Sequence, residues 1–333
     1  MPFGSFTARE RNAGKKAPVA SAAHATKPVA PVTGKSAAVI TTKLNILLIG
    51  RNMEQIREYL CSANTNMTQA LHGQGMTYYT RELAAITDVV SRKKKLEQFF
   101  WNTDQENWCY QTEQMEAPTY TFSISPSGVQ KMVLDLVIRC SVPGQEVDTA
   151  GADICWILAD GMVLDDTLEH DSYRAYMADK LRQFCGGENA SMPVVLLLSQ
   201  IEKWGHFDSV NGATFFPSAA FAKLMSCCKD RFAACVGKGT TVPVIPVQVY
   251  GGLEYCGADA NGQPVLQIGQ SGYYQSYIPE GCEVPGLYTI VRLCAAGENS
   301  LGEDLLHAAR GHFAVKYANA GWQPVYLGVE AEL

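Results

Sequence analysis

Apolar runs of strand length alternate with amphipathic segments of helix length over most of this chain. Leu44–Ile49 and Val194–Ser199 are nearly continuous apolar runs, the pattern of strands buried on both faces of a parallel sheet. The predicted strands are Leu44–Ile49, Tyr120–Ser125, Met132–Arg139, Ile154–Ala159, Val194–Ser199 and Val242–Tyr250. The predicted helices are Met53–Ser62, a patch within Thr80–Phe100, Asp171–Phe184, Ser218–Val236, Gly286–Ala296 and Glu303–Asn319.

This order of elements predicts an α/β fold with a mostly parallel sheet and helices on both faces. Tyr120–Ser125 and Met132–Arg139 are joined by the turn sequence Ser-Pro-Ser-Gly, which predicts a hairpin and therefore one antiparallel strand. Ligands of such sheets bind at the carboxyl ends of the strands. Candidate chemistry is therefore expected in the segment that directly follows each strand.

Composition divides the chain into two parts. Residues 1–42 are rich in Ala, Pro and Lys and poor in large apolar residues, so they cannot bury enough surface to offset the entropy of ordering. We expect a disordered basic arm there, acting as a solvated linker; an organelle transit peptide or a contact with anionic surfaces is the alternative. Residues 43–333 form the folded domain, with a Gly- and Tyr-rich loop insertion at about 251–285 and helices at its C-terminal end.

Charge and cysteine content narrow the class of protein. The net charge is −6; the arm carries six basic residues and one acid, so the arm is +5 and the remainder is −11. An acidic body argues against nucleic acid as its main ligand. The eleven cysteines include no C-x-x-C pair, which predicts reduced, buried thiols in a cytoplasmic protein rather than a zinc site. No apolar stretch approaches the roughly 18 residues that a membrane span needs.

The segment after the first strand reads Gly50-Arg-Asn-Met-Glu-Gln-Ile-Arg57. A phosphate-binding P-loop, G-x-x-x-x-G-K-[ST], wraps phosphates in backbone amides, neutralises them with Lys and holds magnesium with a hydroxyl. Only the first glycine is present at these positions. The second glycine is replaced by Gln55, the lysine by Ile56 and the hydroxyl by Arg57.

Three later segments stand directly behind predicted strands. The first is Ser141-Val-Pro-Gly-Gln145, which comes one residue after the strand Met132–Arg139. The second is Ser199-Gln-Ile-Glu202, which begins at the last residue of the strand Val194–Ser199. The third is Gly251-Gly252, which follows the strand Val242–Tyr250. Thr119 lies just before the second strand.

Taken together, this order of segments resembles the motif order of Ras-like (TRAFAC-type) P-loop GTPases. It is closest to the degenerate GTPase-like proteins of bacterial conflict and GTPase-associated systems. The resemblance implies a P-loop-GTPase-like sheet and assigns vestigial nucleotide-binding positions to ten residues: Gly50, Arg51, Arg57, Thr119, Ser141, Gly144, Gln145, Ser199, Gln200 and Glu202. Among them, Gln145 would position a catalytic water if the protein is active, Thr119 would be the switch threonine, and Ser199, Gln200 and Glu202 would face guanine.

The departures from the family pattern decide the expected function. The lysine, the magnesium hydroxyl and the magnesium-side Asp are replaced by Ile56, Arg57 and Ser141, and phosphoryl transfer depends mostly on positioning and charge stabilisation. We therefore expect a pseudo-GTPase that acts as an interaction or regulatory module with protein partners, binding no metal or cofactor. Asp148-Thr-Ala-Gly151 spells the switch motif literally, but we prefer the register at Ser141 because it directly follows the strand.

Two alternatives remain open. In the first, the chain is an unconventional switch or weak GTPase that binds GTP or GDP with Mg²⁺ and uses Arg51 or Arg57 in place of the P-loop Lys, since Arg is a good partner for phosphate. In the second, the chain is an unrelated α/β enzyme whose loops imitate GTPase spacing. A first helix located elsewhere than behind Gly50, or a different strand order, would favour this second alternative.

Overall fold

The structure is a computed structural model of the chain. Contacts along the chain divide it into two units, and every residue described below lies in the second unit, Ala38–Leu333. The residues that the structure describes are 40–72, 75–80, 83, 118–126, 132–161, 171–186, 192–199, 201, 205–208, 212–217, 219–249, 253–258, 260, 264–268, 279, 281–295 and 325–328. The predicted basic arm, the predicted helical patch within Thr80–Phe100 and the predicted helix Glu303–Asn319 lie almost wholly outside these ranges.

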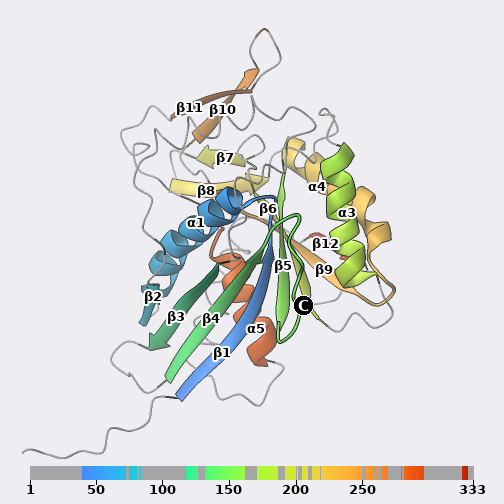
Figure 1. The fold of residues 1–333 in the computed structure, drawn as a ribbon. Coiled ribbons are helices and arrows are strands. Elements are labelled where there is room, and N and C mark those ends of the chain that lie inside the picture. The colour runs from blue at the N-terminus through green and yellow to red at the C-terminus, as the bar shows by residue number, and fades with distance from the viewer. Residues whose placement is uncertain are drawn as a thin grey trace, which may run out of the picture. The chain divides into compact units, whose positions relative to one another are not determined.

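An eight-stranded sheet, in the order β12-β9-β6-β5-β1-β4-β3-β2, forms the centre of the fold (Figure 1). The central strands β4, β1, β5, β6 and β9 are all parallel to their neighbours within this group, so the predicted mostly parallel α/β sheet is confirmed. Their bounds are β1 Ile40–Ile49, β4 Met132–Ser141, β5 Ile154–Asp160, β6 Val194–Ser199 and β9 Thr241–Pro246.

Antiparallel strands close both ends of the sheet. β3 (Thr119–Pro126) pairs antiparallel with β4, which confirms the predicted hairpin. Beyond it, β2 (Met76–Thr80) pairs antiparallel with β3, and at the other end β12 (Val325–Gly328) pairs antiparallel with β9. The structure therefore adds β2 and β12 to the antiparallel strand that the sequence predicts. Strands of four or five residues offer too little alternation to stand out in a sequence.

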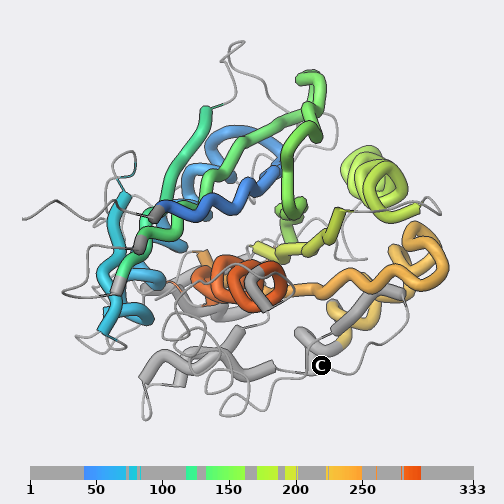
Figure 2. Tube along the Cα trace, turned by 90° about the horizontal axis from the view of Figure 1, so that it is seen from below, coloured from blue at the N-terminus to red at the C-terminus, as the bar shows by residue number. Residues whose placement is uncertain are grey.

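The helices cover both faces of the sheet, as predicted. They are α1 (Met53–His72), α3 (Asp171–Cys185), α4 (Ala219–Phe232), which continues into the 3₁₀ turn η2 (Ala233–Cys235), and α5 (Val284–Ala295). Successive side chains of a strand point to opposite faces. On β5, Trp156 contacts Tyr59 of α1 and Thr289 of α5. Figure 2 shows α3 and α5 on opposite sides of the strands.

α1 is twice as long as predicted. The sequence prediction ended this helix at Ser62, and the next residues include Asn64, Thr65 and Asn66, which have low helix propensity. The helix continues to His72 because Ala63, Met67, Ala70 and Leu71 extend its buried face, and tertiary burial outweighs propensity.

The predicted loop insertion at 251–285 contains two strands and the start of α5. β10 (Leu253–Ala258) and β11 (Pro264–Ile268) pair antiparallel as a separate two-stranded sheet. A second such pair, β7 (Gly205–Asp208) and β8 (Gly212–Pro217), follows β6. Both pairs are inserted where a parallel strand ends, so the chain adds structure at the carboxyl edge of the sheet. Within the described ranges, no helix is long and apolar enough to cross a membrane.

Candidate functional site

The turn between β1 and α1 lies at the carboxyl edge of the sheet and consists of Gly50, Arg51 and Asn52. The Gly50 amide donates to the carbonyl oxygen of Ser141 at 3.0 Å, which ties the turn to the end of β4. A Cβ atom at Gly50 would lie 2.6 Å from Cγ1 of Ile56 and 3.1 Å from Oε1 of Gln55. Position 50 therefore requires glycine because α1 folds its own side chains back onto the turn.

The N-terminus of α1 is capped by side chains of the same turn. The Gln55 amide donates to Oδ1 of Asn52 at 2.9 Å, and the Arg51 amide donates to Oε1 of Gln55 at 2.8 Å. This is a variant of the capping box, in which an N-cap side chain and the side chain three residues later satisfy exposed amides reciprocally. The amides that a P-loop would offer to phosphate are partly satisfied here within the protein.

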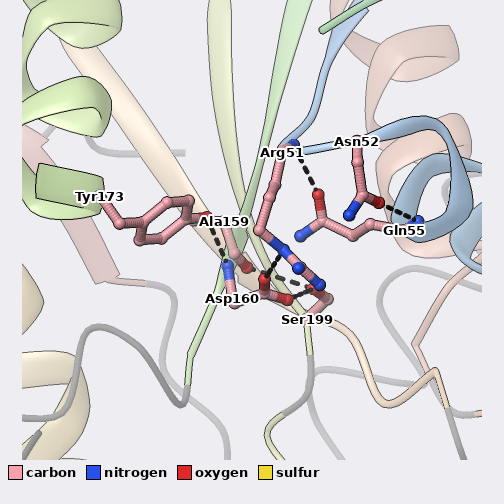
Figure 3. A network of polar contacts seen from close by, with 7 residues as sticks. All are labelled: Arg51, Asn52, Gln55, Ala159, Asp160, Tyr173 and Ser199. Carbon is pink, nitrogen blue, oxygen red and sulfur yellow. Dashed lines mark hydrogen bonds and ion pairs between the residues drawn. The ribbon is translucent and has the colours of Figure 1, made fainter. Parts of the chain in front are cut away.

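Arg51 crosses from this turn to the ends of the neighbouring strands. Its Nε atom lies 2.7 Å from Oδ2 of Asp160, the last residue of β5. The Asp160 side chain is fully buried and the Arg51 side chain is 11% exposed, so this is a buried ion pair. The Ser199 hydroxyl, at the end of β6, donates to Oδ1 of Asp160 at 3.2 Å. Figure 3 shows Arg51 pointing from the turn to this carboxylate.

Tyr173 of α3 approaches Asp160 from the other side (Figure 3). Its hydroxyl accepts a hydrogen bond of 2.9 Å from the Asp160 amide. Burial raises the pKa of the Tyr173 hydroxyl well above its usual value, and the neighbouring Asp160 raises this pKa further. The phenol therefore stays neutral, and the network joins the ends of β1, β5 and β6 to α3.

The turn after β4 is also closed on itself. The Val142 amide donates to Oε1 of Gln145 at 3.3 Å, and the Gln145 amide donates to the Val142 carbonyl oxygen at 3.2 Å. Gly144 has a φ of 85°, a conformation that favours glycine. The side chain predicted to position a catalytic water is thus engaged within its own turn.

The literal switch sequence at Asp148–Gly151 lies away from this network. The Arg139 guanidinium holds the Asp148 carboxylate at 3.1 Å and the Ala150 carbonyl oxygen at 2.7 Å. The Asp148 side chain is 70% exposed. The chain then enters β5 at its amino end, where the Asp153 amide donates to the carbonyl oxygen of Asn45 in the middle of β1. This segment therefore runs back along the sheet, away from its carboxyl edge.

The structure brings some predicted site residues together and not others. Gly50, Arg51, Ser141 and Ser199 lie at the ends of β1, β4 and β6. Thr119 opens β3 opposite Arg139 and is exposed. The other predicted site residues divide as follows: Gly144 and Gln145 form the turn after β4, Arg57 is exposed on α1, and Gln200 and Glu202 lie outside the described residues.

The sequence analysis did not predict Asp160, the acidic partner of Arg51. Asp160 ends a strand of otherwise apolar residues, and a charged residue at that point was the available signal. Asn52 and Gln55 carried a recognisable spacing of a cap residue and an amide three residues later. No sequence signal pointed to Tyr173, because its role depends on how α3 packs against β5.

The residues at the P-loop positions show whether this turn has the groups that bind a nucleotide phosphate and magnesium. The positions of the second glycine, the lysine and the hydroxyl all lie inside α1, at Gln55, Ile56 and Arg57. Ile56 is fully buried against Gly50, and Gln55 is 4% exposed. These side chains offer no ammonium and no hydroxyl to a phosphate or a metal. The described residues also contain no group of three His, Cys, Asp or Glu that could hold a metal ion.

Comparison with known proteins adds no family assignment. The sequence matches no protein-family model and no curated protein.

Proposed function

We propose that this chain is a divergent GTPase-like domain that works as a protein-interaction or regulatory module in a bacterial multi-protein system, without hydrolysing GTP. The observation that carries the proposal is the β1–α1 turn. Its three residues leave no loop long enough to wrap a phosphate, and Gln55 and Ile56 fold back onto Gly50. A domain whose β1–α1 turn is filled by its own side chains is expected to serve through its surfaces.

Two further observations support the GTPase-like part of the proposal. α1 begins directly behind Gly50, which is the position that the resemblance requires and the unrelated-enzyme alternative does not. The carboxyl ends of β1, β4, β5 and β6 meet at one edge of the sheet through the contacts of Gly50 with Ser141, of Arg51 with Asp160 and of Asp160 with Ser199. Convergence at the carboxyl ends of strands is the usual arrangement of ligand sites in open α/β sheets.

The competing function is an unconventional GTP or GDP switch that uses Arg51 or Arg57 for phosphate. Arg51 would have to leave a buried carboxylate at 2.7 Å to reach a phosphate, and breaking a buried ion pair costs about 3–5 kcal/mol. Arg57 is exposed on the second turn of α1 and could serve only if a nucleotide approached from solvent. This geometry weighs against a switch that depends on Arg51. The interaction module that we propose acts in the cytoplasm with protein partners and without Mg²⁺.

Thermal-shift titrations of the whole chain with GTP, GDP and ATP, each with and without Mg²⁺, test the proposal. A bound ligand at about 100 times its dissociation constant would stabilise the fold by about 2.7 kcal/mol, an easily measured rise in melting temperature. We expect no rise with any nucleotide. Micromolar binding that is lost in Arg51→Ala and kept in Arg57→Ala would establish the competing function instead.

A further inference from the structure

The amino edge of the sheet, opposite the candidate site, carries a group of basic side chains that we call the basic cluster. Its members come from the last turns of α3 and α4 and from the turn before β9: Arg182, Lys229, Arg231 and Lys238. The Gly237 amide donates to the Cys185 carbonyl oxygen at 2.7 Å. This bond ties the turn before β9 to the end of α3, so the cluster is built on elements that hold one another in place.

The cluster is notable because the chain as a whole is acidic. Residues 171–186 and 219–249, which contain α3, α4 and β9, carry seven basic and three acidic residues, so this part is +4 in a chain of net charge −6. Basic residues in the last turn of a helix interact favourably with its dipole, which accounts for the cluster residues on α3 and α4. Lys238 lies in a turn and has no such role. Arg182 and Lys238 are exposed, and no ion pair within the described ranges involves either of them.

β12 leads an acidic stretch of the chain to this same edge. It runs antiparallel to β9, and its last residue, Gly328, pairs with Thr241, the first residue of β9. It also lies against α4 and η2, and Figure 1 shows α3, α4, β9 and β12 together at one end of the sheet. Residues 329–333 therefore begin beside the turn that holds Lys238. Their sequence is Val-Glu-Ala-Glu-Leu, with two acids and no basic residue.

The spacing of the two acids fits the cluster. An extended chain advances about 3.3 Å per residue, so Glu330 and Glu332 come within about 7 and 13 Å of Gly328. Alternate residues of an extended chain point to the same side, so both carboxylates can face the basic cluster together. An isolated ion pair on a protein surface contributes little, but several charges in a network contribute more.

We propose that residues 329–333 dock on the basic cluster through the carboxylates of Glu330 and Glu332. The docked segment covers the amino edge of the sheet beside β9, and an acidic segment of another protein binds the cluster only by displacing it. This inference goes beyond the proposed function, because it concerns the edge of the sheet opposite the candidate site.

Carbodiimide cross-linking of the full chain tests the docking, because the reagent joins a lysine amine only to a carboxylate in contact with it. In about 0.01 M salt, we expect mass spectrometry of the monomer to find Lys238 joined to Glu330 or Glu332. The yield should fall at least about fivefold in about 1 M salt, where the screening length shrinks from about 30 Å to about 3 Å. Lys43 is the control amine, since it is exposed on β1, three strands from β9, and it should be joined to neither acid.

Charge reversal within the cluster gives the matched comparison. Arg182→Glu leaves the amine of Lys238 in place and should lower the yield of its cross-link by about fivefold, because the cluster loses positive charge. Arg57→Glu, at an exposed position on α1, changes the net charge by the same amount and should alter the yield by less than about twofold. Equal effects of the two variants would overturn the docking, as would a Lys238 cross-link that is absent or insensitive to salt.

A second measurement decides the matter if Arg182→Glu fails to fold. In the double variant Glu330→Gln, Glu332→Gln, amide hydrogen exchange within 329–333 and within the turn at 237–240 should be about three times faster than in the unaltered chain. Exchange within β5 should not change. Unchanged exchange at 329–333 would contradict the docking. Lys238 cross-links confined to covalent dimers would place the segment on a second copy of the chain and would contradict it as well.

Discussion

Arg51 connects the turn after β1 to Asp160 at the end of β5. Its guanidinium faces a carboxylate that is fully removed from solvent, and a buried charge that loses its partner is strongly destabilising. We predict that Arg51→Met lowers the free energy of unfolding by about 3–5 kcal/mol. Urea denaturation followed by circular dichroism measures this loss.

Two comparisons make that prediction specific. Arg57→Met on the exposed side of α1 should change stability by less than about 0.5 kcal/mol. The double variant Arg51→Met with Asp160→Asn should recover a large part of the loss, because no unpaired charge remains buried. If the double variant is as unstable as the sum of the two single variants, the ion pair is not the reason for the loss.

Alanine substitutions at Gly50 and Gly286 compare the close packing of the β1–α1 turn with the looser packing around a glycine in α5. A Cβ at Gly50 would lie 2.6 Å from Ile56, whereas a Cβ at Gly286 would lie 3.6 Å from Met67. Gly50→Ala should therefore destabilise by about 1–3 kcal/mol through overpacking. Gly286→Ala should be neutral or stabilising by up to about 1 kcal/mol, because alanine is the better helix former. Thermal melting of both variants checks the contrast, and equal effects would contradict the packing of Ile56 onto Gly50.

At the scale of elements, β5 joins the helices on one face of the sheet. Trp156 packs edge-on against Tyr59 of α1, and its indole N–H donates to the Thr289 hydroxyl of α5 at 3.0 Å. The Thr289 hydroxyl in turn donates to the Pro285 carbonyl oxygen. One buried strand residue therefore fixes the position of α5 relative to α1.

Thr289→Val keeps the shape of this side chain and removes its oxygen. The indole N–H of Trp156 would then be buried without a partner, which costs about 1–3 kcal/mol. Thr68→Val is the matched control, because Thr68 makes a similar hydrogen bond on the exposed side of α1 and should cost less than about 0.5 kcal/mol. The two values come from urea denaturation under the same conditions, and equal losses would speak against the role given to the indole bond.

The long elements could be predicted from sequence because burial leaves a clear pattern. β5 and β6 are buried at every position, so their apolar runs mark them directly. The short edge strands β2 and β12 leave no such pattern. The extension of α1 beyond Ser62 could not be predicted either. It depends on the burial of side chains such as Met67 and on contacts with residues distant in sequence, such as that of Asn66 with Pro279.

For the candidate site, the sequence indicates the edge of the sheet where polar residues gather, but not which of their side chains meet. Gly50, Ser141 and Ser199 follow from the rule that ligand sites form at the carboxyl ends of strands. The pairing of Arg51 with Asp160 could not be predicted, because nothing in the spacing of these two residues shows that their side chains meet. Likewise, the return of Gln55 and Ile56 onto Gly50 depends on where α1 begins, and helix ends are the least certain part of a sequence prediction.

At the scale of the whole molecule, buried thiols link stability to alkaline pH. Burial raises the pKa of Cys140, Cys185 and Cys228 to about 12, from a usual value of 9.0. Above pH 9 the unfolded chain ionises these thiols while the folded protein keeps them protonated. Their contribution to stability is therefore complete below pH 9 and is lost as the pH rises from 9 towards 12.

We predict that the free energy of unfolding falls by at least about 1 kcal/mol per pH unit above pH 9. Urea denaturation at pH 8, 9 and 10 measures the slope. The triple variant Cys140→Ala, Cys185→Ala, Cys228→Ala should show a shallower slope, whatever its stability at pH 8. An unchanged slope in this variant would assign the effect to other groups.

We propose above that this chain is a divergent GTPase-like domain, that its β1–α1 turn occupies the phosphate position with the protein's own atoms, and that it binds no nucleotide. The most direct test is an equilibrium titration of the whole chain with GTP and Mg²⁺, followed by isothermal calorimetry. Our account predicts no saturable heat at GTP concentrations up to about 1 mM, a limit that corresponds to a binding free energy weaker than about −4 kcal/mol. Saturable binding at micromolar GTP, abolished by Arg51→Ala, would contradict it.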